Sequence, residues 1–286
     1  MNNLTDEHQY VKLSVGKCHY RIDGPSGGST ILLLHGATVA GWIFERLVPY
    51  FNQAGIRTLT IDLMGHGYSA RPKTVYNLSL FKQQIMQLLD EIRNNPAKFD
   101  SLDVESPISI LGHSLGAAIA ASLVADHPAK FNRVILTAPL VNFNANMPIV
   151  TLFKTPLLGE LLNRIYVIPM LKRRRQKRYA SIADGRFVNK FMSQFLLPGF
   201  EQTVLSLFRS GVLDDQTQTY QSLNEINIPC QVLRGSDDVL VKPEQITYLK
   251  TLLPNAAFKE IENTAHAFIL SHPELLAEEL VAFIKK

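Results

Sequence analysis

Short apolar runs alternate with amphipathic segments along most of the chain. The runs predict strands buried on both faces of a sheet, and they cover residues 30–34, 56–61, 108–111, 134–137, 230–235 and 257–261. Between them, helical spacing and small-residue runs predict helices over residues 42–54, 78–93, 117–125, 243–253 and 273–286. Residues 11–22 alternate around Gly16, which predicts an antiparallel hairpin at a sheet edge. This order predicts an α/β fold with a mostly parallel central sheet and helices on both faces.

The alternation stops between residues 142 and 224. No buried strand is predicted there, and helical segments are interrupted at four prolines, Pro148, Pro156, Pro169 and Pro198. We therefore expect an α/β core built from residues 1–141 and 225–286, with residues 142–224 inserted as a helical cap over the strand ends. Most apolar side chains of the cap would pack it against the core, and the remainder would line an apolar acyl pocket.

The composition is that of a soluble globular protein, with 286 residues, 46% hydrophobic and 19% charged. The sequence contains no apolar run of the length that spans a bilayer. The polar, acidic first residues lead us to expect no secretory signal peptide. Two cysteines, Cys18 and Cys230, lie far apart in the chain, so we expect no disulfide scaffold or zinc site and a cytoplasmic location.

The net charge of +4 is concentrated in one segment. Six of the seven residues from Lys172 to Arg178 are lysine or arginine, so the rest of the chain is mildly acidic. Because a dedicated nucleic-acid-binding protein carries its basic residues over a whole face, this distribution argues against a nucleic-acid partner.

The most informative motif is G-x-S-x-G at residues 112–116, between a predicted strand and a predicted helix. In a strand–turn–helix of this kind, Ser114 lies at the tip of a sharp, strained turn as a nucleophile. Gly112 and Gly116 lack a Cβ atom, so the helix can approach the strand closely. The start of the helix also offers backbone N–H groups to a developing oxyanion.

Together with the later motifs, this elbow resembles the α/β-hydrolase fold superfamily along nearly the whole chain. The family places nucleophile, acid and histidine in that order. Ser114 is followed by Gly235-Ser236-Asp237-Asp238 and then by His266 on a late loop. The resemblance implies a triad of Ser114, Asp238 and His266, because the family places its acid at the end of G-x-x-D. Asp237 would then be a solvated or helix-capping carboxylate.

Two earlier motifs extend the resemblance. His35-Gly36 follows a predicted strand and resembles the family's oxyanion loop, and residues 62–69 match its D-x-x-G-x-G-x-S turn. The resemblance implies an oxyanion hole made by the backbone N–H groups of Ala37 and Leu115.

The remaining histidines have structural interpretations. We expect His113 near the pocket floor, His35 as a loop anchor and His66 as a support of its turn. The others are expected at the surface; they are His8, His19, His127 and His272. No cluster has metal-ligand spacing and no glycine-rich stretch matches a nucleotide-binding motif, so we expect no metal and no cofactor.

The resulting prediction is a serine carboxylic-ester hydrolase (esterase or lipase-like) that forms an acyl-enzyme with apolar short- to medium-chain esters. A C–C bond hydrolase, a thioesterase and an amidase or peptidase of the same fold remain alternatives, as does a catalytically silent ligand-binding member. Dehalogenase and epoxide hydrolase chemistry is disfavoured, because those relatives use an aspartate where this chain has Ser114.

The basic segment from Lys172 to Arg178 has three interpretations. It is a solvated helix face, a contact with an anionic membrane surface, or a docking site for an acidic partner. An acyl-carrier protein would be such a partner, as it is for some cap-bearing esterases of the family that the chain resembles.

Overall fold

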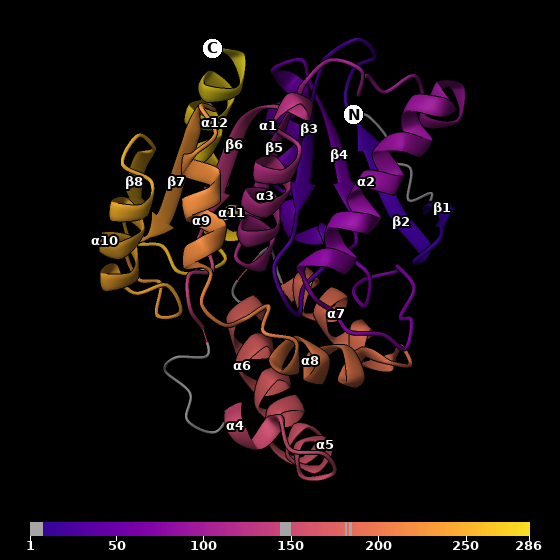
Figure 1. The fold of residues 1–286 in the computed structure, drawn as a ribbon, viewed down its shortest axis with the longest axis vertical. Helices are drawn as coiled ribbons and strands as arrows, with labels where there is room; N and C mark the ends of the chain where they lie inside the picture. Colours follow the sequence, from indigo (N-terminus) through magenta and orange to yellow (C-terminus); the bar gives the residue numbers. More distant parts are fainter. Residues whose placement is uncertain (1–7, 144–149, 181, 183–184) are drawn as a thin grey trace.

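The computed structural model describes residues 8–143, 150–180, 182 and 185–286. In this part of the chain one sheet of eight strands has the order β1-β2-β4-β3-β5-β6-β7-β8 (Figure 1). The strands are β1 (Gln9–Leu13), β2 (Gly16–Asp23), β3 (Ser29–Leu34), β4 (Ile56–Ile61), β5 (Ile108–His113), β6 (Phe131–Thr137), β7 (Cys230–Gly235) and β8 (Ala257–Ile261). β2 pairs antiparallel with β1 and β4, and all other pairs are parallel. The predicted mostly parallel sheet with an edge hairpin is confirmed.

Helices cover both faces of the sheet (Figure 1). On one face lie α2 (Leu78–Asn94), α3 (Leu115–Asp126) and α9 (Thr217–Asn224), and on the other lie α1 (Val48–Gln53), α11 (Phe268–Ser271) and α12 (Glu274–Lys285). The apolar core is accordingly divided into two clusters. Leu32 and Leu34 of β3 belong to one cluster, while Ile31 and Leu33 belong to the other, because successive side chains of a strand point to opposite faces.

The helices of the cap lie beyond the carboxyl ends of the parallel strands (Figure 1). They are α4 (Val150–Phe153), α5 (Leu158–Leu162), α6 (Ile168–Ala180), α7 (Arg186–Ser193) and α8 (Phe200–Arg209). The predicted insertion, residues 142–224, also contains α9, which packs against α3 beside the sheet. The hydroxyl of Tyr220 on α9 donates to the carbonyl of Leu140 at 2.7 Å. The helices over the strand ends therefore finish at α8.

Prolines explain where several helices begin. The helix predicted over residues 42–54 is instead a 3-10 turn, η1 (Gly41–Phe44), followed by α1. Pro49 stands in the first turn of α1, where its missing N–H has no helical partner to lose. Pro156 and Pro198 lie between helices, as predicted.

One other proline, Pro169, does not follow this simple rule. Pro169 lies inside a continuous helical path, directly after a π-helical turn, η5 (Asn163–Val167). Such a turn alters the hydrogen-bond ladder at the point where proline removes a donor. Pro148 and the first seven residues lie outside the described part of the chain.

The remaining elements are short or peripheral. They are α10 (Pro243–Leu252), which follows β7, and the 3-10 turns η2 (Pro96–Phe99), η3 (Pro128–Lys130) and η7 (Gln194–Leu196). None of the helices within the described ranges combines the length and the apolar character needed to cross a membrane.

Candidate active site

Ser114 occupies the turn between β5 and α3 with φ 56° and ψ −114°. Positive φ is unfavourable for a residue with a Cβ atom, so the surrounding packing holds this serine in a strained conformation. A Cβ atom on Gly112 would come within 2.2 Å of the Gly116 carbonyl oxygen, and one on Gly116 within 2.1 Å of the Leu34 carbonyl oxygen. The two glycines are therefore required for the helix to start directly behind the strands.

Asp238 and His266 meet at the neighbouring strand ends. Asp238 follows β7, and His266 lies between β8 and α11. Both residues are buried, with exposed fractions of 2% for Asp238 and 5% for His266. The His266 Nδ1 atom lies 2.8 Å from Asp238 Oδ2. Because the acceptor is a carboxylate, Nδ1 donates this hydrogen bond, and Nε2 is left to accept a proton.

Asp238 is held in its ionised form. Burial alone would raise its pKa, but His266 and the N–H groups of Leu240 and Val241 hold the pKa below its ordinary value. These two N–H groups donate to Oδ1 at 2.8 and 3.1 Å. Asp237 is exposed, and its carboxylate accepts a hydrogen bond from the hydroxyl of Ser236. The geometry thus pairs His266 with the carboxylate that ends G-x-x-D.

Ser114 and His266 border the same cavity, which has a volume of about 330 Å³. Within the described residues no hydrogen bond joins the Ser114 hydroxyl to His266. Hydrogen bonds between nucleophile and base are often long in free enzymes and shorten when substrate binds. Ser114 is half-buried, so its hydroxyl is accessible from the cavity.

His35 orients one of the expected oxyanion donors. Its Nε2 accepts the N–H of Leu63 at 2.9 Å, so the proton of the neutral ring is on Nδ1, which donates to the Gly36 carbonyl at 2.8 Å. Burial lowers the pKa of His35 and favours this neutral form. The Gly36 carbonyl and the Ala37 N–H belong to one planar trans peptide, so His35 directs the Ala37 N–H away from its own ring.

Leu115 and Ala37, whose N–H groups were expected to bind the oxyanion, both border the cavity beside Ser114. A Cβ atom on Gly36 would lie 3.0 Å from the Ser114 Cβ, so the His35–Ala37 loop passes directly over the nucleophile. The structure thus brings together all five residues that the sequence singled out.

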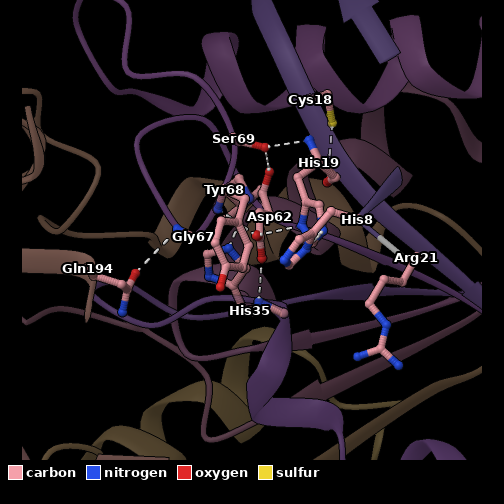
Figure 2. Close-up of polar contacts among 12 residues, drawn as sticks. His8, Cys18, His19, Arg21, His35, Asp62, Gly67, Tyr68, Ser69 and Gln194 are labelled. Atoms are coloured by element: carbon pink, nitrogen blue, oxygen red, sulfur yellow. Dashed lines mark hydrogen bonds and ion pairs between the residues drawn. The ribbon is translucent and has the colours of Figure 1, made fainter. Parts of the chain in front are cut away.

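Asp62 is the centre of a second polar network (Figure 2). Its Oδ1 accepts the Gly41 N–H at 2.7 Å, and its Oδ2 accepts the Tyr68 N–H at 2.9 Å and the His19 ring at 2.7 Å. Burial opposes ionisation, but His19 and the other donors lower the pKa of Asp62 to about 2. The carboxylate therefore ties the loop after β3 to the turn after β4.

His19 corrects one prediction. It was expected at the surface but is only 6% exposed, because it pairs with Asp62 and its main-chain N–H donates to the Ser69 hydroxyl at 2.9 Å. Strand alternation located β2 in the sequence but gave no indication of a partner 43 residues away. The D-x-x-G-x-G-x-S motif itself was the available signal, since its buried aspartate needs donors.

His113 and His66 are buried as neutral rings. Burial, with His266 and Arg175 as further causes, lowers the pKa of His113 well below its ordinary value. Burial, with His35 as the next cause, lowers the pKa of His66 to about 3. The ring centroids of His113 and His266 are 5.0 Å apart, so a neutral His113 avoids opposing the proton that His266 would accept.

The cavity is mainly apolar and is lined by residues of the cap and of the loops at the strand ends. Its aliphatic and aromatic lining residues are Leu140, Val141, Phe143, Val167, Met170, Leu171, Val204, Leu207, Phe208, Leu213, Val239, Leu240 and Val241. Arg174 and Arg175 of the basic segment also line it, which the sequence interpretation missed. The sequence did contain a signal for this placement. Arg174 lies four residues after Met170, and Arg175 lies four residues after Leu171, so each arginine shares a helix face with an apolar residue.

Among the described residues, no group of His, Cys, Asp and Glu could hold a metal ion.

Known proteins are similar to this chain over nearly its whole length. A non-heme chloroperoxidase of Streptomyces lividans is 23% identical over 278 residues, covering 93% of this chain and 95% of the relative. A pimeloyl-[acyl-carrier protein] methyl ester esterase of Aromatoleum aromaticum is 27% identical over 264 residues, covering 88% and 97%. The crystal structure of the enol-lactonase from Burkholderia xenovorans has a TM-score of 0.75 at 17% identity, covering 97% of this chain and 100% of that one.

The chain also matches the model of one protein family over most of its length. The model of the family described as serine aminopeptidase, S33, matches residues 27–272, which include the elbow, the acid and the histidine. This chain therefore belongs to the S33 serine aminopeptidase family and is a hydrolase of the α/β-hydrolase fold.

Proposed function

We propose that this protein hydrolyses carboxylic esters through an acyl-enzyme formed on Ser114. The observation that carries the proposal is the hydrogen-bonded pair of Asp238 and His266, 2.8 Å apart, at a cavity that Ser114 also borders. A serine hydroxyl is protonated at neutral pH, so it needs a base of this kind to become a nucleophile.

The reaction would follow from these positions. As the Ser114 Oγ attacks the ester carbonyl carbon, its proton passes to His266 Nε2, and Asp238 stabilises the imidazolium. The carbonyl oxygen becomes an oxyanion that accepts hydrogen bonds from the N–H groups of Ala37 and Leu115. Collapse breaks the bond to the alcohol, which takes the proton from His266. Water then attacks the acyl-enzyme by the same steps and releases the acid.

The cavity supports esters over peptides with a free amino terminus. Its described lining contains no aspartate or glutamate, whereas an α-ammonium group is normally bound by a carboxylate. The apolar lining and the volume of about 330 Å³ support a short- to medium-chain acyl or aromatic group. One similar protein, the pimeloyl-[acyl-carrier protein] methyl ester esterase, also has an ester in its name.

The proposed compartment is the cytoplasm. Cys18 and Cys230 are both free thiols, which supports the expectation of a reducing environment.

The test compares the wild-type protein with Ser114→Ala on p-nitrophenyl esters of two to twelve carbons, beside thioesters and amino-acid p-nitroanilides. We expect ester turnover by the wild type and a loss of about 1,000-fold or more in the variant. A fluorophosphonate probe should label the wild type at Ser114. Equal nitrophenol release by both proteins on every ester would refute the proposal, and turnover of anilides alone would assign an aminopeptidase instead.

A further inference from the structure

One face of α6 forms part of the catalytic cavity. Met170, Leu171, Arg174 and Arg175 all line it, and their spacing of three and four residues places them on the same side of the helix. Arg173 and Lys177, on other faces of α6, are exposed and do not line the cavity. The basic segment is therefore divided, and the residues of it that line the cavity are Arg174 and Arg175.

Arg175 lies close to the reacting groups. It is half-buried, and it also borders a narrow crevice that Ser114, His266 and Ala37 share with it. Its charge contributes to lowering the pKa of the buried His113, after burial and His266. Arg174 is more exposed and lines the wider cavity. Arg175 thus borders both the crevice beside Ser114 and the wider cavity, whereas the more exposed Arg174 borders the wider cavity.

The charge of this lining is not balanced. Three cations line the cavity, Arg174, Arg175 and Lys242, and its described lining includes no aspartate or glutamate. Among the described residues, neither Arg174 nor Arg175 forms an ion pair with a carboxylate. The nearby Asp238 carboxylate accepts hydrogen bonds from His266 and from two main-chain N–H groups.

Such an arrangement favours an anionic ligand. Cations next to one another and beside an apolar wall repel each other and lose hydration, and an anion would relieve both costs. A guanidinium binds carboxylate and phosphate oxygens through paired hydrogen bonds, which are stronger than those between neutral groups.

We propose that the physiological substrate is an ester that carries a carboxylate or phosphate group, which Arg174 and Arg175 bind while Ser114 attacks the carbonyl. This inference rests on the proposed esterase function. The aliphatic part of the substrate then occupies the apolar lining, and Lys242 contributes positive charge at the rim.

The experiment measures kcat/KM on two matched pairs of esters. The first pair is monoethyl adipate and ethyl hexanoate, and the second is butanoyl glycerol 3-phosphate and butanoyl glycerol, with acid release followed by pH-stat. We expect the wild type to prefer the anionic member of at least one pair by 10-fold or more, and the pair that shows the preference identifies the anion. Raising the salt concentration should reduce this preference.

The variants are Arg174→Gln, Arg175→Gln and their combination, with Arg173→Gln as the matched control on the exposed side of the same helix. We expect the double variant to lose at least 10-fold in the anionic-to-neutral ratio, while Arg173→Gln keeps the wild-type ratio. A wild type without preference in either pair, but active on neutral esters, overturns this inference and leaves the esterase proposal standing.

Two further results are informative. Equal loss on both members of a pair in Arg175→Gln would show that this side chain acts on the reacting centre rather than on a substrate anion, and would overturn the proposal. If no ester is turned over faster by the wild type than by Ser114→Ala, the esterase function itself fails.

Discussion

At the scale of single residues, His35 lies outside the proposed triad but holds a peptide of the expected oxyanion hole in place. Its ring accepts a hydrogen bond from the Leu63 N–H and donates one to the Gly36 carbonyl. The peptide bond that contains this carbonyl also contains the Ala37 N–H. A hydrogen bond to the carbonyl polarises the peptide and strengthens its N–H as a donor. His35 is therefore a positioning residue for the expected oxyanion hole.

Replacing His35 by alanine should lower kcat for p-nitrophenyl esters by about 10- to 100-fold, because one oxyanion donor loses its alignment. KM should change little, since the substrate cavity is formed by other residues. The measurement is steady-state kinetics, normalised by titration of active sites with a fluorophosphonate so that misfolded protein is not counted.

His127→Ala is the control, because this histidine ends α3 away from the cavity and should leave kcat unchanged. An unchanged kcat in His35→Ala would remove His35 from the catalytic account. A loss confined to the number of titratable sites would assign it a purely structural role.

At the scale of elements, local patterns predicted the strands and most core helices. Each buried apolar run became a strand within a few residues of its predicted ends, because burial on both faces requires a continuous run. The prediction of one helix over residues 42–54 was wrong, because a 3-10 turn ends at Phe44 and a new helix, with Pro49 in its first turn, begins at Val48. The pairing of His19 with Asp62 was also not predictable, because strand periodicity gives the face of a residue but not its distant partner.

Gly116→Ala should destabilise the protein by about 3 kcal/mol or more, because the added methyl group would lie 2.1 Å from the Leu34 carbonyl oxygen and force α3 away from β3. Urea unfolding measured by circular dichroism gives the change in the free energy of unfolding. Esterase activity should fall as well, since Ser114 and Leu115 move with the start of α3.

Gly27→Ala is the control for Gly116→Ala, because it adds backbone strain without a steric collision. Gly27 has φ +78°, but nothing lies within 4 Å of an added Cβ, so only the conformational cost of about 1 kcal/mol applies. Equal destabilisation by the two substitutions would mean that close packing of α3 on β3 contributes nothing.

At the scale of the whole molecule, the site combines distant parts of the chain. The expected oxyanion loop follows β3, Ser114 follows β5, and Asp238 and His266 follow β7 and β8. Each of these could be located from the sequence because each is marked by a local motif. The sequence also predicted an apolar pocket beneath the cap, but not which residues line it, because the lining forms only where the cap meets the strand ends and includes Arg174 and Arg175.

Asp62 ties the loop after β3 to the turn after β4, and its ionisation should be visible in the stability of the whole protein. Its pKa of about 2 in the folded state lies below the ordinary value of 3.8, so the carboxylate stabilises the fold above about pH 4, by about 2 kcal/mol. This contribution is lost as the pH falls from 4 to 2, where the folded state must also take up the proton.

Asp62→Asn removes the titration and places an amide among the N–H donors of Gly41 and Tyr68. We expect it to lower the free energy of unfolding by about 2 kcal/mol or more at pH 7, and the difference from the wild type to shrink between pH 4 and pH 2.5. Urea titrations at pH 7, 5, 4, 3 and 2.5 measure this difference. Asp237→Asn, at an exposed carboxylate outside this network, should show no difference that depends on pH. A difference for Asp62→Asn that stays constant over the same range would show that the Asp62 network is not a charged one.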